Sequence, residues 1–339
     1  MQKLDATQVL LLRHGESTFN QQGRCQGCSD ESVLSEKGKR TAVLAGAYLR
    51  HQPPDVIFAS PLRRARETAE IVRATLRSSA VRVVLHELLR EADLPFWEGL
   101  TYDQVRSNFS REYRTWREPP DLLRMGGARP VADLYRRAGR FWTEIRPQWA
   151  GKSVLIVSHL GTCRALIGSA LGIPAKFYHR TQHSNGGLSV LEFDGAEVNK
   201  PGFCRVKALN LTGHLERVLP KLKEGKRGVR LLLLASDGGA STRLLDEWKA
   251  DFVTSTEALN GENFYPVDGT VRTGVVIAPA PSLLSILMTA IGARQQDGSR
   301  WAMRDGHISV LHYPKLNGAG VLQVFNSPVA MQTGERSTA

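Results

Sequence analysis

Two histidines stand where short apolar strands are predicted to end. His14 follows the apolar run 9–12, with Arg13 beside it, and His159 follows the β-branched run 154–157. In open α/β sheets, ligands bind at the carboxyl ends of the strands. A histidine in such a place can act as a nucleophile, and the donor fork of an arginine matches phosphate oxygens. The pattern therefore predicts chemistry on a phosphate group at one edge of a sheet.

A third strand end lies between the two histidines. Residues 58–60 complete an apolar run, and the helix predicted after them carries Arg64 on its first turn. The segment after His159 has helical spacing from Thr162 to Leu171 and stops at a Gly-Ile-Pro sequence, which terminates helices. This alternation of strands and helices predicts a three-layer αβα sandwich with a mostly parallel sheet.

Taken in order, these motifs resemble those of the histidine phosphatase superfamily, the phosphoglycerate-mutase-like enzymes. They fall within residues 7–215. The matching motifs are Arg13-His14-Gly15-Glu16-Ser17 with Asn20, Gly23-Arg24-Cys25-Gln26-Gly27, Leu34-Ser35-Glu36-Lys37-Gly38, Ser60-Pro61-Leu62-Arg63-Arg64-Ala65 and Ser158-His159. A lone Arg-His-Gly triplet is weak support for a family, whereas an ordered set of this kind is specific.

The resemblance implies a covalent mechanism in which His14 attacks a phosphomonoester and becomes phosphohistidine. It places His159 beside the transferred phosphoryl group, where cationic side chains stabilise the charge on its oxygens. The expected phosphate- or substrate-binding residues are Arg13, Asn20, Gln26, Arg64 and Leu160. No metal ion and no cofactor is implied, because these side chains supply the positive charge.

A proton donor is also needed for the alkoxide that leaves. The resemblance assigns this role to Glu91, a few residues before a turn at Gly99, with Asp93 and Glu98 as competing carboxylates. A general acid has to hold its proton near neutral pH, and afterwards it is able to activate water as a base. The same residue would therefore serve both the formation and the hydrolysis of the phosphohistidine.

The segment between Glu91 and His159 bears on the substrate. A helical insertion at residues 100–145 is expected to cap the pocket, with Phe109, Tyr113 and Trp116 at helical spacing and assigned to the core. A role in substrate specificity remains open for His183 and Asn185, which precede a Gly-Gly turn.

The composition describes an ordinary globular chain with an unusual charge. It has 339 residues, enough for two domains, with a net charge of +12 and a pI near 9.8. Because no lysine-rich tail or nucleic-acid motif accompanies that charge, we expect a small anionic metabolite as partner, and neither nucleic acid nor membrane. The four cysteines include the pair Cys25 and Cys28, but no second pair completes a zinc site. With no signal-like N-terminus, the expected location is the cytoplasm, and a homodimer remains open.

The C-terminal third echoes the first part at a fixed offset. Residues 275–279 match 155–159 at a shift of 120, with Pro279 where His159 stands, and 309–311 match 189–191 at the same shift. A fixed offset indicates an internal repeat. We therefore expect a catalytic domain over 1–222 and a shortened, catalytically dead copy over 226–339, separated by a basic linker.

The resemblance extends to function. Most similar are the metal-independent phosphoserine phosphatases, although Leu94 stands where some of them carry a histidine. The leading hypothesis is a phosphatase acting on a small phosphomonoester, with phosphoserine as the best single substrate. The alternative is a phosphoglycerate mutase primed by 2,3-bisphosphoglycerate, and a remote alternative is a pseudo-phosphatase that binds partners.

Overall fold

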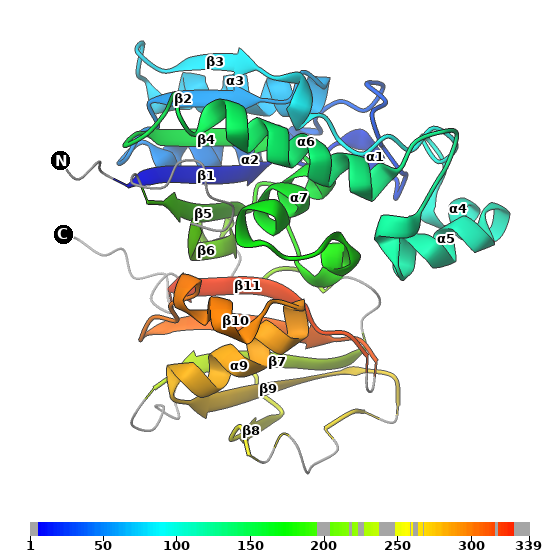
Figure 1. Ribbon diagram of the computed structural model, residues 1–339, viewed down its shortest axis with the longest axis vertical. Helices are drawn as coiled ribbons and strands as arrows, with labels where there is room; N and C mark the ends of the chain where they lie inside the picture. Colours follow the sequence, from blue (N-terminus) through cyan, green and yellow to red (C-terminus); the bar gives the residue numbers. More distant parts are fainter. Residues whose placement is uncertain are drawn as a thin grey trace. The chain divides into compact units, whose positions relative to one another are not determined.

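The structure is a computed structural model (Figure 1), and part of the chain falls outside its description. The described residues are 6–194, 204–216, 219–222, 227–236, 248–257, 259, 264–266, 268–315 and 318–328. The chain forms two compact units. Unit 1 comprises Met1–His179 and His183–Arg205, and unit 2 comprises Arg180–Gln182 and Val206–Ala339. The division at 222 and 226 remains a prediction, and the linker residues 223–226 lie outside the described residues.

The sheet of unit 1 has the strand order β3-β2-β4-β1-β5. Its strands are β1 (Thr7–Arg13), β2 (Val56–Ala59), β3 (Arg82–Leu85), β4 (Ser153–Ser158) and β5 (Leu188–Phe193). The first four run parallel to their neighbours, whereas β5 pairs antiparallel with β1. The predicted, mostly parallel sheet is therefore confirmed.

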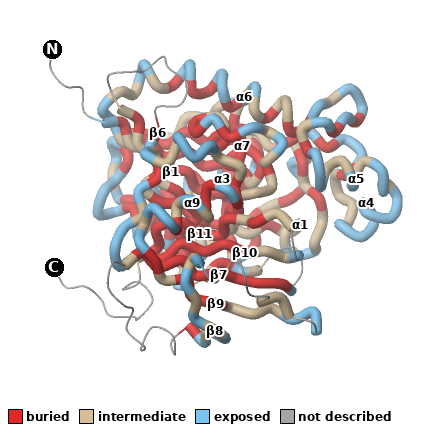
Figure 2. Tube along the Cα trace, turned by 60° about the horizontal axis from the view of Figure 1, so that its bottom comes forward, coloured by how far each residue is buried: buried red, intermediate tan, exposed pale blue. Residues whose placement is uncertain are grey.

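Helices cover both faces of this sheet, so the predicted three-layer αβα sandwich is also confirmed (Figure 1). Helices α2 (Glu36–Leu49) and α3 (Arg63–Leu76) bury their apolar side chains against inward residues of the strands such as Leu10 and Leu155. On the other face lie α6 (Pro130–Ile145) and α7 (Leu160–Leu171), and Phe58 of β2 contacts Phe141 of α6. Figure 2 shows β1 and α7 as largely buried.

The shorter elements of unit 1 are α1 (Thr18–Gln21), η1 (Glu87–Leu89), α4 (Tyr102–Asn108), α5 (Ser110–Arg117), η2 (Pro120–Leu122) and η3 (Ala175–Arg180). Helices α4 and α5 belong to the predicted insertion. Helix α5 buries none of its residues, so it does not form part of the hydrophobic core.

Two glycines let the turn after β1 pack closely on the start of α2. A Cβ atom on Gly15 would overlap the carbonyl of Gly38, and one on Gly38 would overlap the carbonyl of Glu16. Helix α2 begins at this contact, because the hydroxyl of Ser35 accepts the amide proton of Gly38 at 3.0 Å and caps the helix. The Leu-Ser-Glu-Lys-Gly motif therefore supports the turn that carries His14.

The strands of unit 2 follow the order β6-β11-β10-β7-β9-β8. Its elements are β6 (Cys204–Leu211), η5 (Gly213–Leu215), β7 (Gly228–Ala235), β8 (Phe252–Thr254), β9 (Val271–Ala278), α9 (Ala280–Ile291), η7 (Gln295–Arg300), β10 (His307–Tyr313) and β11 (Val321–Pro328). Strand β9 runs parallel to β7 and β8, and β10 runs antiparallel to β7 and β11. Residues 229–239 echo residues 9–15 in the sequence without the Arg-His pair, and 237–239 lie outside the described residues.

Among the described residues, no helix of either unit has the length and apolar character needed to cross a membrane.

Candidate active site

Three neighbouring parallel strands deliver their C-terminal residues to one place in unit 1. Strands β2, β4 and β1 end at Ala59, Ser158 and Arg13, so that Ser60, His159 and His14 follow at the same edge. The backbone amide of His14 donates to the carbonyl of Ser158 at 2.8 Å. The rings of His14 and His159 lie edge to face, with centroids 5.2 Å apart. The sheet thus brings the two predicted histidines together.

The ring of His14 is held in one orientation. Its Nδ1 lies 2.7 Å from the carbonyl of Gly15, which only accepts, so Nδ1 carries the proton and Nε2 keeps its lone pair. The side chain is 2% exposed. Burial, together with the positive charges of Arg64 and Arg13, holds the pKa of His14 well below its usual value. His14 is therefore a neutral imidazole with a nucleophilic Nε2 at neutral pH.

His159 is buried behind His14 at the N-terminus of α7. Its Nε2 lies 2.8 Å from the hydroxyl of Ser60, and that hydroxyl also accepts the amide proton of Leu62 at 3.3 Å. Ser60 is thus free to donate to Nε2, which leaves the proton of His159 on Nδ1. This Nδ1 has no partner among the described residues. Burial and the charge of Arg64 lower the pKa of His159 as well.

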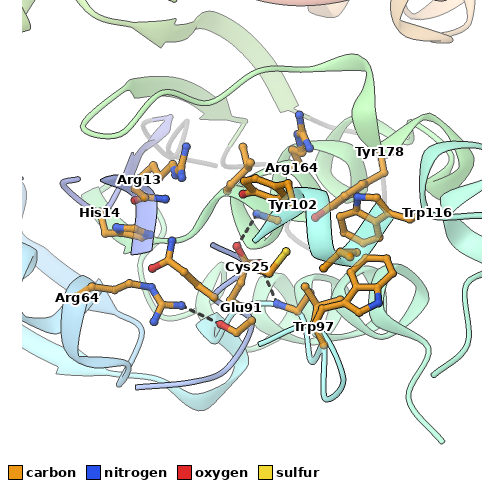
Figure 3. Close-up of a pocket in the computed structure, with 18 of the residues that line it drawn as sticks. Arg13, His14, Cys25, Arg64, Glu91, Trp97, Tyr102, Trp116, Arg164 and Tyr178 are labelled. Atoms are coloured by element: carbon orange, nitrogen blue, oxygen red, sulfur yellow. Dashed lines mark hydrogen bonds between the residues drawn. The ribbon is translucent and has the colours of Figure 1, made fainter. Parts of the chain in front are cut away.

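The two arginines of the site are fixed by backbone carbonyls. Arg13 donates from Nη1 to the carbonyl of His183 at 2.8 Å. Arg64, fully buried, donates from Nη1 and Nη2 to the carbonyls of Ser29 and Gly27, each at 2.8 Å. Each guanidinium has five N–H donors, so both retain donors for a ligand. Figure 3 shows Arg13, His14 and Arg64 on the same side of the pocket.

The loop that holds Arg64 depends on Glu98, one of the competing carboxylates. The Oε1 atom of Glu98 accepts the amide proton of Cys28 at 2.6 Å. Burial raises the pKa of Glu98 from its usual value. Glu98 therefore positions the loop 27–29, while the other competitor, Asp93, is exposed to solvent and does not line the pocket.

Glu91 points into the pocket and is held from both ends of its carboxylate. Oε1 accepts the amide proton of Ala92 and Oε2 that of Gly161, each at 2.9 Å. A Cβ atom at Gly161 would overlap both Oε1 and the hydroxyl of Tyr178, so this glycine makes room for the carboxylate. The thiol of Cys28 donates to the carbonyl of Glu91 at 3.1 Å, which fixes the backbone of this segment.

Asn20 and Gln26 lie on the loop that faces the histidines. The Oδ1 atom of Asn20 accepts from Nδ2 of Asn185 at 2.9 Å, so the amide nitrogen of Asn20 is left to donate. Gln26 accepts from the hydroxyl of Ser17 at 2.8 Å. Asn185 also donates to the carbonyl of His14 at 3.1 Å. Asn185, a candidate for substrate specificity, therefore braces the turn that carries His14 and does not line the pocket.

One pocket collects most of the predicted residues (Figure 3). Its lining consists of Arg13, His14, Asn20, Cys25, Gln26, Gly27, Arg64, Glu91, Ala92, Leu94, Trp97, Tyr102, Val105, Tyr113, Trp116, Leu160, Gly161, Arg164 and Tyr178. His159 lies outside this lining, against the ring of His14.

The assignment of Tyr113 and Trp116 to the core was wrong. Both residues are half-buried and line the pocket, where they contact the buried ring of Trp97. Phe109 is half-buried as well and is not part of the lining. Helical spacing alone does not distinguish an apolar face that packs on a core from one that packs on a ligand.

The sequence comparison gives the family. Residues 9–201 match the histidine phosphatase superfamily (branch 1). The chain belongs to the histidine phosphatase superfamily. It is 37% identical over 205 residues to a probable 2-carboxy-D-arabinitol-1-phosphatase of Arabidopsis thaliana. The alignment covers 60% of this chain and 42% of the plant protein. The chain thus spans less than half the length of this relative.

Two further relatives match over nearly their whole length. Phosphoserine phosphatase 1 of Hydrogenobacter thermophilus is 31% identical over 208 residues, 61% of this chain and 93% of the relative. A crystal structure of the Entamoeba histolytica phosphoserine phosphatase in complex with 3-phosphoglyceric acid aligns with a TM-score of 0.53 and 26% identity. The alignment covers 62% of this chain and 99% of that structure.

Sequence reasoning missed two pocket residues of this histidine phosphatase, Arg164 and Tyr178. Arg164 is the only charged residue of α7, an otherwise apolar and small-residue helix, and it is buried. A lone arginine in an apolar helical segment, five residues after His159, is visible in the sequence and could have indicated a site residue. Tyr178 gave no comparable signal, because it lies in the short 3-10 helix η3, which has no periodic sequence pattern.

Cys25 and Cys28 are free thiols beside the pocket. Burial raises the pKa of Cys25 to about 12, and it also raises the pKa of Cys28. A thiol with a raised pKa is a poor nucleophile and a poor metal ligand near neutral pH. Their described roles are structural, with Cys25 in the pocket wall and Cys28 on the backbone of Glu91.

Proposed function

We propose that this histidine phosphatase is a metal-independent phosphomonoesterase that uses His14 as its nucleophile. The observation that carries the proposal is the state of His14, a neutral imidazole whose Nδ1 is committed to the carbonyl of Gly15. Its reactive Nε2 belongs to a pocket that also contains Arg13, Arg64 and Glu91. Nucleophile, cationic clamp and proton donor are the three parts that covalent phosphoryl transfer requires.

In the first step, Nε2 of His14 attacks the phosphorus, the N–P bond forms and the P–O bond to the alcohol breaks. Glu91 in its acid form donates a proton to the departing alkoxide oxygen. The remaining N–H donors of Arg13 and Arg64 bind the equatorial phosphoryl oxygens and stabilise their charge. Nδ1–H of His159 and the amide of Asn20 supply further donors to these oxygens.

In the second step, the carboxylate of Glu91 takes a proton from a water molecule, which attacks the phosphohistidine. The N–P bond breaks, His14 returns to its neutral form, and inorganic phosphate leaves. The arginines lower the pKa of both histidines while the site is empty, and the negative charge of a bound phosphoryl group opposes that effect. When the phosphohistidine forms, the negative charge of its phosphoryl group therefore compensates the excess positive charge of the site.

Phosphoserine is the best single substrate we propose. It is supported by the match to phosphoserine phosphatase 1 over 93% of its length and by the likeness to the Entamoeba histolytica enzyme. The plant relative is named for a different phosphate ester, 2-carboxy-D-arabinitol 1-phosphate. Leu94, buried in the pocket wall, leaves an apolar surface where some phosphoserine phosphatases carry a histidine.

Release of inorganic phosphate from a panel of phosphorylated metabolites tests the proposal, with excess chelator and with His14→Ala as the control. We expect one preferred phosphomonoester to be hydrolysed by the natural protein, and no hydrolysis by the variant. If no compound releases phosphate but 3-phosphoglycerate isomerises after priming with 2,3-bisphosphoglycerate, the protein is a mutase. If the variant retains activity, His14 is not the nucleophile.

We also propose that unit 2 is a shortened copy of the catalytic fold without its chemistry. Helix α9 and the turn η7 begin and end 120 residues after α7 and η3, and Gly292 ends α9 with a φ of 72°, as Gly172 ends α7 with 71°. Pro279 stands at the position of His159. A crystal structure in which residues 271–313 do not superpose on 151–193 would contradict the duplication. A cytoplasmic location and a homodimer also remain predictions.

A further inference from the structure

The pocket contains a third arginine that the proposed phosphoryl transfer does not use. Arg164 is 8% exposed and lies on the wall formed by α7 (Figure 3). Its guanidinium carbon lies 5.2 Å from the centroid of the Tyr178 ring, a cation–π contact, and its Nη1 lies 3.3 Å from Nδ1 of His179. Arg164 thus places a buried guanidinium in the pocket lining, in contact with two aromatic side chains.

His179 sets the direction of this guanidinium. Its Nε2 lies 2.6 Å from the carbonyl of Trp116, which only accepts, so Nε2 carries the proton and Nδ1 accepts from Arg164. Trp116 belongs to α5 and also lines the pocket. The orientation of Arg164 is thus coupled to the segment that covers the site.

The other lining residues limit what Arg164 can bind. Arg13 and Arg64 serve the transferred phosphoryl group, and the lining side chains from α4 and α5 are uncharged, namely Tyr102, Val105, Tyr113 and Trp116. A single planar fork with five donors matches one carboxylate, which carries one negative charge and two coplanar oxygens. With Arg13 and Arg64 engaged by the transferred phosphoryl group, a second phosphate dianion would find only Arg164 as a further cation among the described lining residues.

We propose that Arg164 binds a carboxylate of the substrate, and that His179 and Tyr178 position it for that contact. The substrate class is then a phosphomonoester of a small hydroxy acid or amino acid, with its carboxylate a few bonds from the ester oxygen. This inference rests on the proposed phosphatase activity, which it makes more specific.

Two matched pairs of compounds test the proposal. Phosphoserine and O-phosphoethanolamine differ only by the carboxylate, and 3-phosphoglycerate and glycerol 3-phosphate differ by a carboxylate in place of a hydroxymethyl group. We expect kcat/KM to be roughly 100-fold higher for the compound with the carboxylate. The other compound of each pair offers no anionic group to the buried guanidinium of Arg164. Arg164→Met should reduce that ratio to less than about fivefold. Arg164→Lys keeps the positive charge but lacks the planar donor fork of the guanidinium, so its ratio should lie between those of the natural protein and Arg164→Met.

Within each variant, the ratio of the two kcat/KM values reports recognition of the carboxylate alone. A loss of folded protein or of catalytic rate lowers kcat/KM for both compounds equally and leaves the ratio unchanged. His179→Leu should also lower the ratio, mainly through KM, whereas Arg140→Met on the exposed side of α6 should leave it unchanged. Equal kcat/KM values for both members in the natural protein would overturn the carboxylate site and leave the phosphatase intact. Hydrolysis of none of the four compounds would overturn the proposed substrate class, and hydrolysis of no phosphomonoester in the wider panel would overturn both proposals. If the natural protein prefers bisphosphates and Arg164→Met loses that preference, Arg164 binds a second phosphate group and not a carboxylate.

Discussion

Gly161→Ala is a small change with a large predicted effect on catalysis. The added Cβ would overlap Oε1 of Glu91 and the hydroxyl of Tyr178, and would lie 3.1 Å from Cδ of Glu91. Both side chains lie in the pocket wall, and Oε2 of Glu91 accepts the amide proton of Gly161 at 2.9 Å. The carboxyl group must therefore move by roughly 1 Å to restore ordinary contact distances, and it loses its alignment with the departing oxygen.

A displacement of this size at a catalytic group costs about 100-fold in rate, or about 2.7 kcal/mol of transition-state stabilisation. The matched control is Gly139→Ala in α6, where the added Cβ meets no atom within 4 Å. That control should stabilise the protein by about 0.5–1 kcal/mol, because alanine favours the helix, and should leave kcat unchanged.

The assay compares an alkyl phosphate with p-nitrophenyl phosphate, whose leaving group is a weak base that departs without a proton donor. For Gly161→Ala we expect kcat for the alkyl phosphate to fall about 100-fold, while the initial burst of nitrophenolate changes by less than about fivefold. Equal losses on both substrates would mean that the substitution perturbs the phosphoryl site and not the acid. An unchanged kcat for the alkyl phosphate would refute the role of Glu91 as proton donor.

Three further predictions follow from the two buried histidines and from the loop at Arg64. Because burial holds the pKa of His14 and His159 below 6.5, the unfolded chain binds protons first as the pH falls. The free energy of unfolding should therefore drop by about 1 kcal/mol per histidine between pH 6.5 and 5.5, as measured by urea titration. In His14→Phe about half of this drop should disappear, and an unchanged drop would show that His14 does not titrate this way. Glu98→Ala removes the carboxylate that holds the loop of Arg64, so the inhibition constant of inorganic phosphate should rise roughly tenfold; an unchanged constant would contradict that role.

Much of the site could be predicted because parallel strands bring their carboxyl ends to one edge. His14 and His159 are 145 positions apart in the sequence, yet β1 and β4 are neighbours whose registered pairing runs to Arg13 and Ser158. An apolar run followed by a polar motif is visible in the sequence, and the fold class then determines where the motif lies. For this reason the three-layer sandwich and the meeting of His14, His159 and the two arginines could be predicted from the sequence, while the roles of these side chains remain predictions.

What could not be predicted depends on contacts without a periodic signal. The role of Glu98 rests on a hydrogen bond to the amide of Cys28, and nothing in the spacing of the two residues indicates it. Tyr113 and Trp116 share the spacing of a core helix, but α5 buries none of its residues, and these two side chains line the pocket. Arg164 is positioned by His179, from a turn beyond the end of its own helix. Each of these depends on tertiary structure that a local pattern does not contain.

The central claim is a covalent phosphohistidine at His14, and it is tested most directly by trapping that intermediate. Glu91→Ala, which lacks the base for the second step, is mixed with p-nitrophenyl [32P]phosphate and quenched in alkali, where phosphohistidine survives, and the labelled peptide is mapped. We predict close to one phosphate per chain on the peptide that contains His14, and no label when His14→Ala is added to the same variant. Label on another residue, or nitrophenolate release without any labelled protein, would contradict the mechanism.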